Sequence, residues 1–285
     1  MPLSSSARVV SETDAHPDRS VAIIGATGVL CALVVLATSA TLRLATSMES
    51  GSAVTQLAVA VENPVRLLHR VAAMAISGLS LWAFVVALRG RKHTRASKTR
   101  FQMAGTLLLL TIFLSILGPF TPGYRIDAIT VGNVTGGVAL VLVFQAWWMS
   151  GQAGSGPTAM RPTSAKLAMC VFAAQISLGA LVSAQAMTQR FGWLLPHIGG
   201  AIVLIGCTVF WHMTSSESGL ARRRLILGLV LMHVQAAGGI ALALLAERPL
   251  GLAVAHAMLS PLIGMVLLGA WLARDGGLET LRDDA

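Results

Sequence analysis

The sequence is poor in charged residues, which make up only 12% of its 285 positions. A soluble domain of ordinary composition carries about 25%. Hydrophobic residues make up 55% of the chain, and its mean hydropathy is +0.73. This composition excludes an ordinary soluble domain and indicates a protein that crosses a membrane several times.

Cysteine is absent from the loops, where a structural disulfide would need it, and acidic residues are scarce in the apolar stretches, where an ion-coupled transporter would need them. The three cysteines lie in apolar stretches and not in loops, so no structural disulfide is expected; they are Cys31, Cys170 and Cys207. The sequence has no Walker motif, no Gly-x-Ser-x-Gly, no His-Glu-x-x-His and no Cys-x-x-Cys. Acidic residues are nearly missing from the apolar stretches, which argues against an ion-coupled transporter.

Eight apolar stretches are present, each close to the about 20 residues that a membrane-spanning helix needs. They cover 21–42, 67–88, 102–120, 127–149, 166–187, 194–213, 225–246 and 250–272. We therefore expect an all-α membrane protein with eight transmembrane helices. Residues 1–20 lack the basic start and short apolar run of a cleaved signal peptide, so the first helix is expected to act as an uncleaved signal anchor.

The net charge is +9, and the basic residues behind it are unevenly distributed between the two sides of the expected membrane. All but six of the 21 Lys and Arg residues fall in the two tails and in alternate loops, on one side of the expected membrane. By the positive-inside rule, both termini of this multi-pass inner (cytoplasmic) membrane protein are then cytoplasmic. No soluble basic domain remains, so nucleic-acid binding is not expected. The six exceptions lie near the opposite helix ends: Arg43, Arg66, Arg70, Arg125, Arg190 and Arg248.

A Gly-, Ser- and Pro-rich interruption at 150–165 divides the chain into two halves. Short loops elsewhere favour up-and-down packing of neighbouring helices. We expect two pseudo-repeated four-helix bundles, formed by 21–149 and 166–272. The interruption is then a cytoplasmic linker, and 1–20 and 273–285 are cytoplasmic tails.

Polar residues recur at matching positions of the two halves. His69 corresponds to His197, and Asn133 corresponds to His256. The stretches 166–187 and 225–246 each carry a Gln-x-x-x-Gly pattern, at 175–179 and 235–239. The halves therefore resemble parallel tandem copies.

Three histidines, His69, His197 and His256, fall in the first turns of stretches that begin on the same side of the membrane. An imidazole within hydrocarbon is costly and marks a functional site. His197 and His256 have matched depth on repeat-equivalent helices, and two facing imidazoles can bind haem iron from both sides inside a four-helix bundle. The alternative is a pair of hydrogen-bonded histidines without a cofactor.

The first half has only one of these ligands, because Asn133 replaces the second histidine and an amide is a poor haem ligand. This half either binds a transient haem through His69 with the opposite face open, or it carries a decayed site. Arg70 directly follows His69 and is a candidate for a haem propionate, since arginine binds carboxylates through a bidentate fork. The alternative for Arg70 is contact with lipid headgroups.

Several of these segments resemble the haem A synthase family. TLRLATSMESG at 41–51 is similar to that family's Arg-Leu-Thr-x-Ser-Gly stretch, and LLHR at 67–70 to its His-Arg opening of the second helix. AQISLGALV at 174–182 is similar to its Gln-x-x-x-Gly segment. The strongest match is the run from 234 to 264, which includes His256. The resemblance spans nearly the whole chain.

The resemblance implies an enzyme that oxidises a methyl group of haem O to a formyl group, giving haem A for cytochrome oxidase biogenesis. It implies that His197 and His256 hold a permanent haem b, and that His69 lies in the pocket for the substrate haem O. An external donor would supply electrons. Haem O synthase and cytochrome oxidase assembly factors are the implied partners within the lipid bilayer.

The sequence departs from the family pattern mostly in the first half. Arg66 stands three residues before His69, where the family has a glutamate, and Asn133 stands at the position of its helix-four histidine. Glu62, two helical turns before His69, is the candidate substitute acid, with Pro64 between them. Ile198 follows His197 where the family often has arginine. The alternatives to an enzyme are a non-catalytic b-type cytochrome or haem-handling membrane protein, and a scaffold or transporter without haem.

Overall fold

The computed structural model describes residues 18–47, 54–90, 95–118, 127–152, 162–186, 192–215, 219–245 and 249–273. Within these ranges the chain forms eight α-helices and no strand. The helices are α1 (Arg19–Ser47), α2 (Val54–Arg89), α3 (Arg95–Leu117), α4 (Asp127–Gln152), α5 (Thr163–Ala186), α6 (Leu194–Thr214), α7 (Gly219–Leu244) and α8 (Leu250–Leu272). Each contains a segment long and apolar enough to cross a bilayer. The prediction of an all-α, multi-pass membrane protein with eight helices is confirmed.

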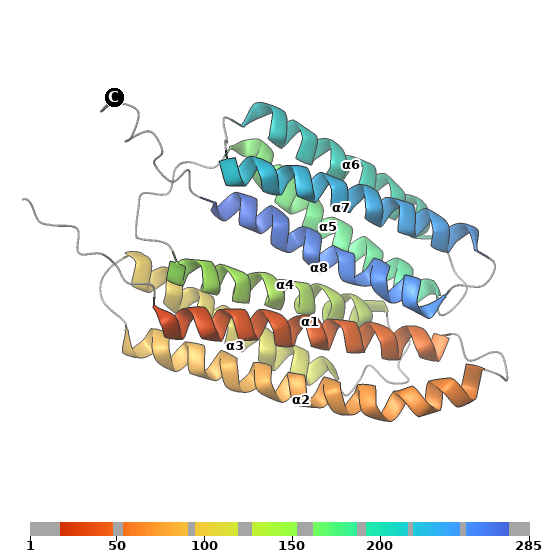
Figure 1. Cartoon of the computed structure of the whole chain (residues 1–285), viewed down its shortest axis with the longest axis horizontal. Coiled ribbons are helices and arrows are strands. Elements are labelled where there is room, and N and C mark those ends of the chain that lie inside the picture. The colour runs from red at the N-terminus through yellow and green to blue at the C-terminus, as the bar shows by residue number, and fades with distance from the viewer. Residues whose placement is uncertain are drawn as a thin grey trace, which may run out of the picture.

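The helix bounds agree best for α6, which ends one residue after the predicted end, and for α8, which has the predicted bounds. α2 is the main exception, because it begins at Val54 and not at 67. Pro64 lies inside it, where proline removes a helical hydrogen bond and bends the helix, and the ribbon of α2 bends near its start (Figure 1). The predicted linker 150–165 is helical at both ends, while 153–161 and most of both predicted tails lie outside the described residues.

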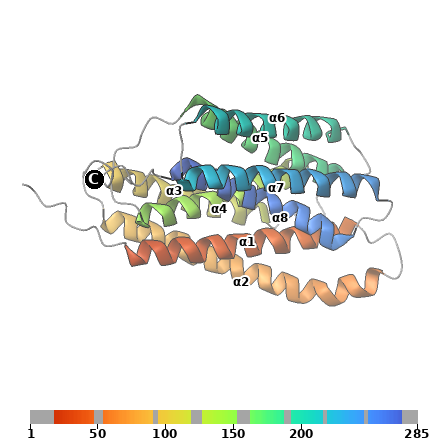
Figure 2. The same ribbon diagram turned by 45° about the horizontal axis from the view of Figure 1, so that its top comes forward.

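The helices pack as two groups of four that lie side by side (Figure 1, Figure 2). In the first group α1 and α3 each contact both α2 and α4. In the second group the hairpins α5–α6 and α7–α8 meet through α6 with α7 and α5 with α8. α4 and α1 contact α8, and α4 contacts α5, which joins the two groups. We call the end where α1 begins and α8 ends the terminus end, and the opposite end the far end.

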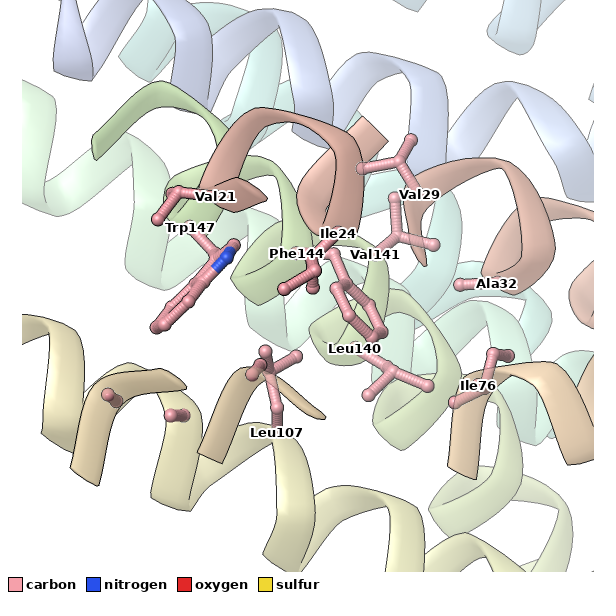
Figure 3. Close-up of a cluster of buried hydrophobic side chains, with 13 residues drawn as sticks. Val21, Ile24, Val29, Ala32, Ile76, Leu107, Leu140, Val141, Phe144 and Trp147 are labelled. Atoms are coloured by element: carbon pink, nitrogen blue, oxygen red, sulfur yellow. The ribbon is translucent and has the colours of Figure 1, made fainter. Parts of the chain in front are cut away.

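Large apolar side chains fill the first group toward the terminus end (Figure 3). Ile24 of α1, Leu107 of α3 and Phe144 and Trp147 of α4 are fully buried there. Gly25 of α1 permits this packing, because a Cβ at that position would lie 2.5 Å from the Cβ of Trp148. The second group has a matching cluster that includes Phe172, Trp211, Leu225 and Leu267.

The buried side chains become small toward the far end. At the level of the three candidate histidines and beyond, the buried residues in the described ranges are mostly alanine and threonine, with Ile176 as the larger exception: Thr38, Ala40, Thr130, Ile176, Ala180 and Ala184. The dense core therefore anchors the terminus end of each group. The far end holds the histidines among small and polar residues.

Candidate functional site

His197 lies in the first turn of α6 and is held by α5 at two points. The amide nitrogen Nε2 of Gln175 lies 3.0 Å from Nδ1 of His197, and it also donates to the main-chain carbonyl oxygen of His197 at 3.0 Å. Gly179, one turn farther along α5, lies beneath the ring: a Cβ there would be 3.1 Å from Cε1 of His197. A larger residue at Gly179 would thus push the imidazole away from α5.

His256 has the corresponding surroundings in the next hairpin. It is the seventh residue of α8, and Gln235 of α7 places its Nε2 3.5 Å from Nε2 of His256. The same amide nitrogen donates to Oγ of Ser260 at 3.1 Å. Gly239 lies beneath this ring as Gly179 does beneath the other, because a Cβ at Gly239 would be 3.0 Å from Cε1 of His256.

These two sets of residues are versions of one arrangement, which we call the His–Gln–Gly unit. The first unit is His197, Gln175 and Gly179, and the second is His256, Gln235 and Gly239. Each unit spans one helical hairpin, α5–α6 or α7–α8. The imidazoles of His197 and His256 are both half-buried, and they lie near enough for a charge on one to disfavour a charge on the other. The units therefore occupy the same region of the second group, with α6 and α8 at opposite corners.

The two units contain buried polar atoms that lack a hydrogen-bond partner. Among the described residues, Oε1 of Gln175, Oε1 of Gln235 and Nδ1 of His256 are buried without a hydrogen-bond partner. A buried polar atom without a partner costs about 1–3 kcal/mol. Three such atoms within one pair of units indicate a place where a further group binds, or where the amides and rings turn when it does.

The two histidines suit a metal that is already bound by another ligand when it enters the site. In the part of the chain that the structure describes, no three His, Cys, Asp or Glu side chains gather around one point. Two imidazoles complete the coordination of iron when a porphyrin supplies four nitrogens. Glycine at 179 and 239 lets each imidazole pack directly against the neighbouring helix, which sets the position of the ring. The residues present thus fit a haem between α6 and α8.

His69 of α2 faces α1 in the first group. Its Nδ1 lies 3.0 Å from Oγ1 of Thr38, and that hydroxyl also lies 2.7 Å from the carbonyl oxygen of Val34. The same hydroxyl lies 3.1 Å from the carbonyl oxygen of Val35. When the threonine proton goes to either carbonyl, which can only accept, the threonine oxygen accepts a hydrogen bond from Nδ1–H of His69. This leaves the lone pair on Nε2. A histidine that ligates a metal through Nε2 has this tautomer and this kind of partner on Nδ1.

The structure places the other predicted residues of the first group as follows. Asn133 is the half-buried seventh residue of α4, the position that His256 has in α8. Arg70 is exposed on α2, and Arg66 is half-buried one turn before it. Glu62 belongs to α2, but its side chain lies outside the described residues.

Sequence reasoning missed two of the polar partners. Thr38 was not predicted to contact His69, although a buried imidazole in a membrane helix needs a partner for its second nitrogen. Ser260 was missed as well, although it follows His256 by four residues and so shares its helix face. Gln175 and Gln235 were noticed only as a repeat, and the structure gives them a contact each with a histidine.

Comparison of the chain with protein-family models, with curated proteins and with solved structures finds no match.

Proposed function

We propose that this chain is a haem-binding membrane protein of the haem A synthase type, with haem b held between His197 and His256. The repeated His–Gln–Gly unit carries this proposal. Two hairpins present the same three residue types to a shared region, which suits a flat ligand with two similar faces. One imidazole from each hairpin would then occupy each axial position of the iron.

Bound at this site, haem b supplies one-electron transfer. The protein supplies orientation and tuning. Ligation through Nε2 of His197 requires a proton on Nδ1, and Oε1 of Gln175 accepts a hydrogen bond from that Nδ1–H when the amide turns toward the ring. That turn would give the buried Oε1 the partner it now lacks, and it would exchange for this the bond from Nε2 of Gln175 to the main-chain carbonyl of His197.

We propose that the first group of helices holds the site for the substrate haem. His69 would ligate haem O, whose methyl group is oxidised to a formyl group to give haem A, with dioxygen as the oxidant and electrons from an external donor reducing the surplus oxygen atoms to water. The contact with Thr38, which leaves Nε2 of His69 available, supports this assignment. Asn133 provides no imidazole on the α4 side, which suits a haem that must enter and leave. Glu62 is the proposed acidic group, and Arg70 on the exposed surface of α2 is the proposed partner of a propionate.

The proposed location is the inner membrane with both termini in the cytoplasm. Basic residues cluster at the terminus end of the described helices, at Arg19, Arg89, Lys98, Arg100 and Arg222–Arg224. The positive-inside rule assigns that end to the cytoplasm. The three histidines at the far end would then lie toward the outer side, and haem O synthase or cytochrome oxidase assembly factors would be the partners.

A non-catalytic b-type cytochrome or haem-handling protein is the second candidate. Two residues of the first group favour it, because Arg66 and Asn133 replace a glutamate and a histidine of the family pattern. The second group would keep its haem under this alternative, and His69 would have no substrate.

Product analysis separates the candidates. The protein is purified from cells that make haem O, and the extracted pigments are identified by chromatography and mass spectrometry. The enzyme predicts haem A with the wild-type chain, no haem A with His69→Ala, and unchanged haem A with His212→Ala in the last turn of α6. Haem b alone in every sample favours the cytochrome. A colourless protein under haem-replete expression contradicts both.

A further inference from the structure

The two His–Gln–Gly units differ in which ring nitrogen meets the glutamine. In the first unit Gln175 lies at Nδ1 of His197, 3.0 Å away. In the second unit Gln235 lies at Nε2 of His256, 3.5 Å away, and Nδ1 of that ring is buried without a hydrogen-bond partner among the described residues. The glutamine therefore contacts Nε2 of His256 in one unit and Nδ1 of His197 in the other.

The strength of attachment differs too. Gln175 contacts both the ring and the main-chain carbonyl of His197, so it fixes the imidazole and the first turn of α6 together. The side-chain amide of Gln235 reaches His256 only at the limit of hydrogen-bond distance and donates instead to Ser260 at 3.1 Å, while the main chain of Gln235 also interacts with the ring. The side-chain amide of Gln175 therefore holds its histidine more closely than the side-chain amide of Gln235 does.

The helix that carries His256 is also weaker around it. Pro261 lies inside α8, five residues after His256, and is buried. Proline has no N–H to give to the carbonyl of the residue four positions earlier, here Ala257, next to His256. α6 has its only proline, Pro196, in the first turn, where the missing N–H costs little. The backbone at His256 can thus bend or shift at lower cost than the backbone at His197.

We infer that His197 is the permanent axial ligand and His256 the exchangeable one, so that a small neutral ligand such as carbon monoxide or dioxygen can bind on the α8 side of the reduced haem. This inference rests on the proposed haem site. In the exchange the bond from iron to Nε2 of His256 breaks and a bond to the small ligand forms, with no change in electron count. The freed imidazole returns to its contact with Gln235.

The test is a carbon monoxide titration of the dithionite-reduced holoprotein, followed by optical absorption. Wild type should bind carbon monoxide, and His256→Ala should keep haem and bind it more tightly. Pro261→Ala restores the N–H opposite Ala257 and should weaken binding by about fivefold. Gln235→Leu removes the competing contact to Nε2 and should also weaken it. Pro196→Ala in α6 is the matched control and should bind as wild type does.

Three results would overturn the inference. The first is that the haem of reduced wild type keeps both histidines at saturating carbon monoxide and binds none. The second is that Pro261→Ala and Gln235→Leu both bind carbon monoxide as wild type does. The third is that His197→Ala, and not His256→Ala, keeps a haem open to carbon monoxide. Absence of haem from every sample is a different failure, because it overturns the proposed haem site together with this inference.

Discussion

The hydroxyl of Thr38 on α1 accepts a hydrogen bond from Nδ1 of His69 on α2, across 3.0 Å, because its own proton is directed to the carbonyl of Val34. In this arrangement Nδ1 of His69 carries the ring proton and Nε2 keeps its lone pair. The contact also ties α1 and α2 together near the far end.

Thr38→Val tests that contact, because valine keeps the shape and removes the acceptor. The buried Nδ1–H of His69 then lacks this acceptor, which should destabilise the protein by about 1–3 kcal/mol. Affinity for haem at His69 should fall about 10- to 100-fold, the usual effect of removing the partner of a ligating histidine. Thermal unfolding in detergent and haem titration measure the two effects. Thr41→Val is the control, since its hydroxyl bonds the carbonyl of Ala37 in its own helix; equal losses in both variants would contradict the role of Thr38.

Gly179→Ala and Gly239→Ala should each displace a histidine ring. The added Cβ would lie 3.1 Å or 3.0 Å from Cε1 of the facing imidazole, which is closer than ordinary van der Waals contact. Haem occupancy should fall, and the low-spin absorption bands should shift. Gly206→Ala in α6 is the control, because nothing lies within 4 Å of its Cβ and alanine favours the helix by about 1 kcal/mol. Normal haem spectra in both test variants would argue against a haem beside these glycines.

Gln175 should tune the haem through His197. Gln175→Glu places a carboxylate beside Nδ1–H of the ring, which raises the basicity of the ligating nitrogen and should lower the midpoint potential by on the order of tens of millivolts. Gln175→Leu removes both contacts to His197 and should reduce haem retention. Potentiometric titration with optical detection measures the shift. A potential that rises or stays constant in Gln175→Glu would show that Gln175 does not act on the ligand.

Asn133→His should give the first group a second histidine ligand for haem iron. Asn133 has the position in α4 that His256 has in α8, so the new imidazole would come from the helix that corresponds to α8. We expect a second low-spin haem per chain, measured as haem bound per mole of protein, with loss of any haem A formation because the open face is closed. An unchanged haem content would indicate that the first group does not bind haem.

The sequence predicted the parts of this account that depend on hydrophobic length and on spacing. Eight apolar stretches predict eight helices, and α8 has the predicted bounds. The start of α2 was wrong because residues 54–66 contain Pro64 and Glu62, which do not look like a membrane segment although their backbone is helical. The start of α7 was late because Arg222–Arg224 interrupt the apolar pattern without interrupting the helix.

The candidate site was predictable only in part. Matched depth predicts that His197 and His256 belong together, and in the structure they lie near enough for charges on the two rings to repel each other. Which ring nitrogen each glutamine contacts depends on the orientation of the imidazole, and residue spacing in the sequence does not predict that orientation. The contact of His69 with Thr38 depends on the rotation of α1 relative to α2. That rotation depends on how α1 and α2 pack in the apolar cluster that includes Leu36 and Ile76.

The central claim is that His197 and His256 ligate one haem. The most direct measurement is the electron paramagnetic resonance spectrum of the oxidised, purified protein together with its reduced optical spectrum. We predict a low-spin bis-imidazole signal and a b-type spectrum for wild type, high-spin haem in His256→Ala, and loss of haem in His197→Ala. A low-spin signal unchanged in both variants, or a wild-type protein without haem, would contradict the account.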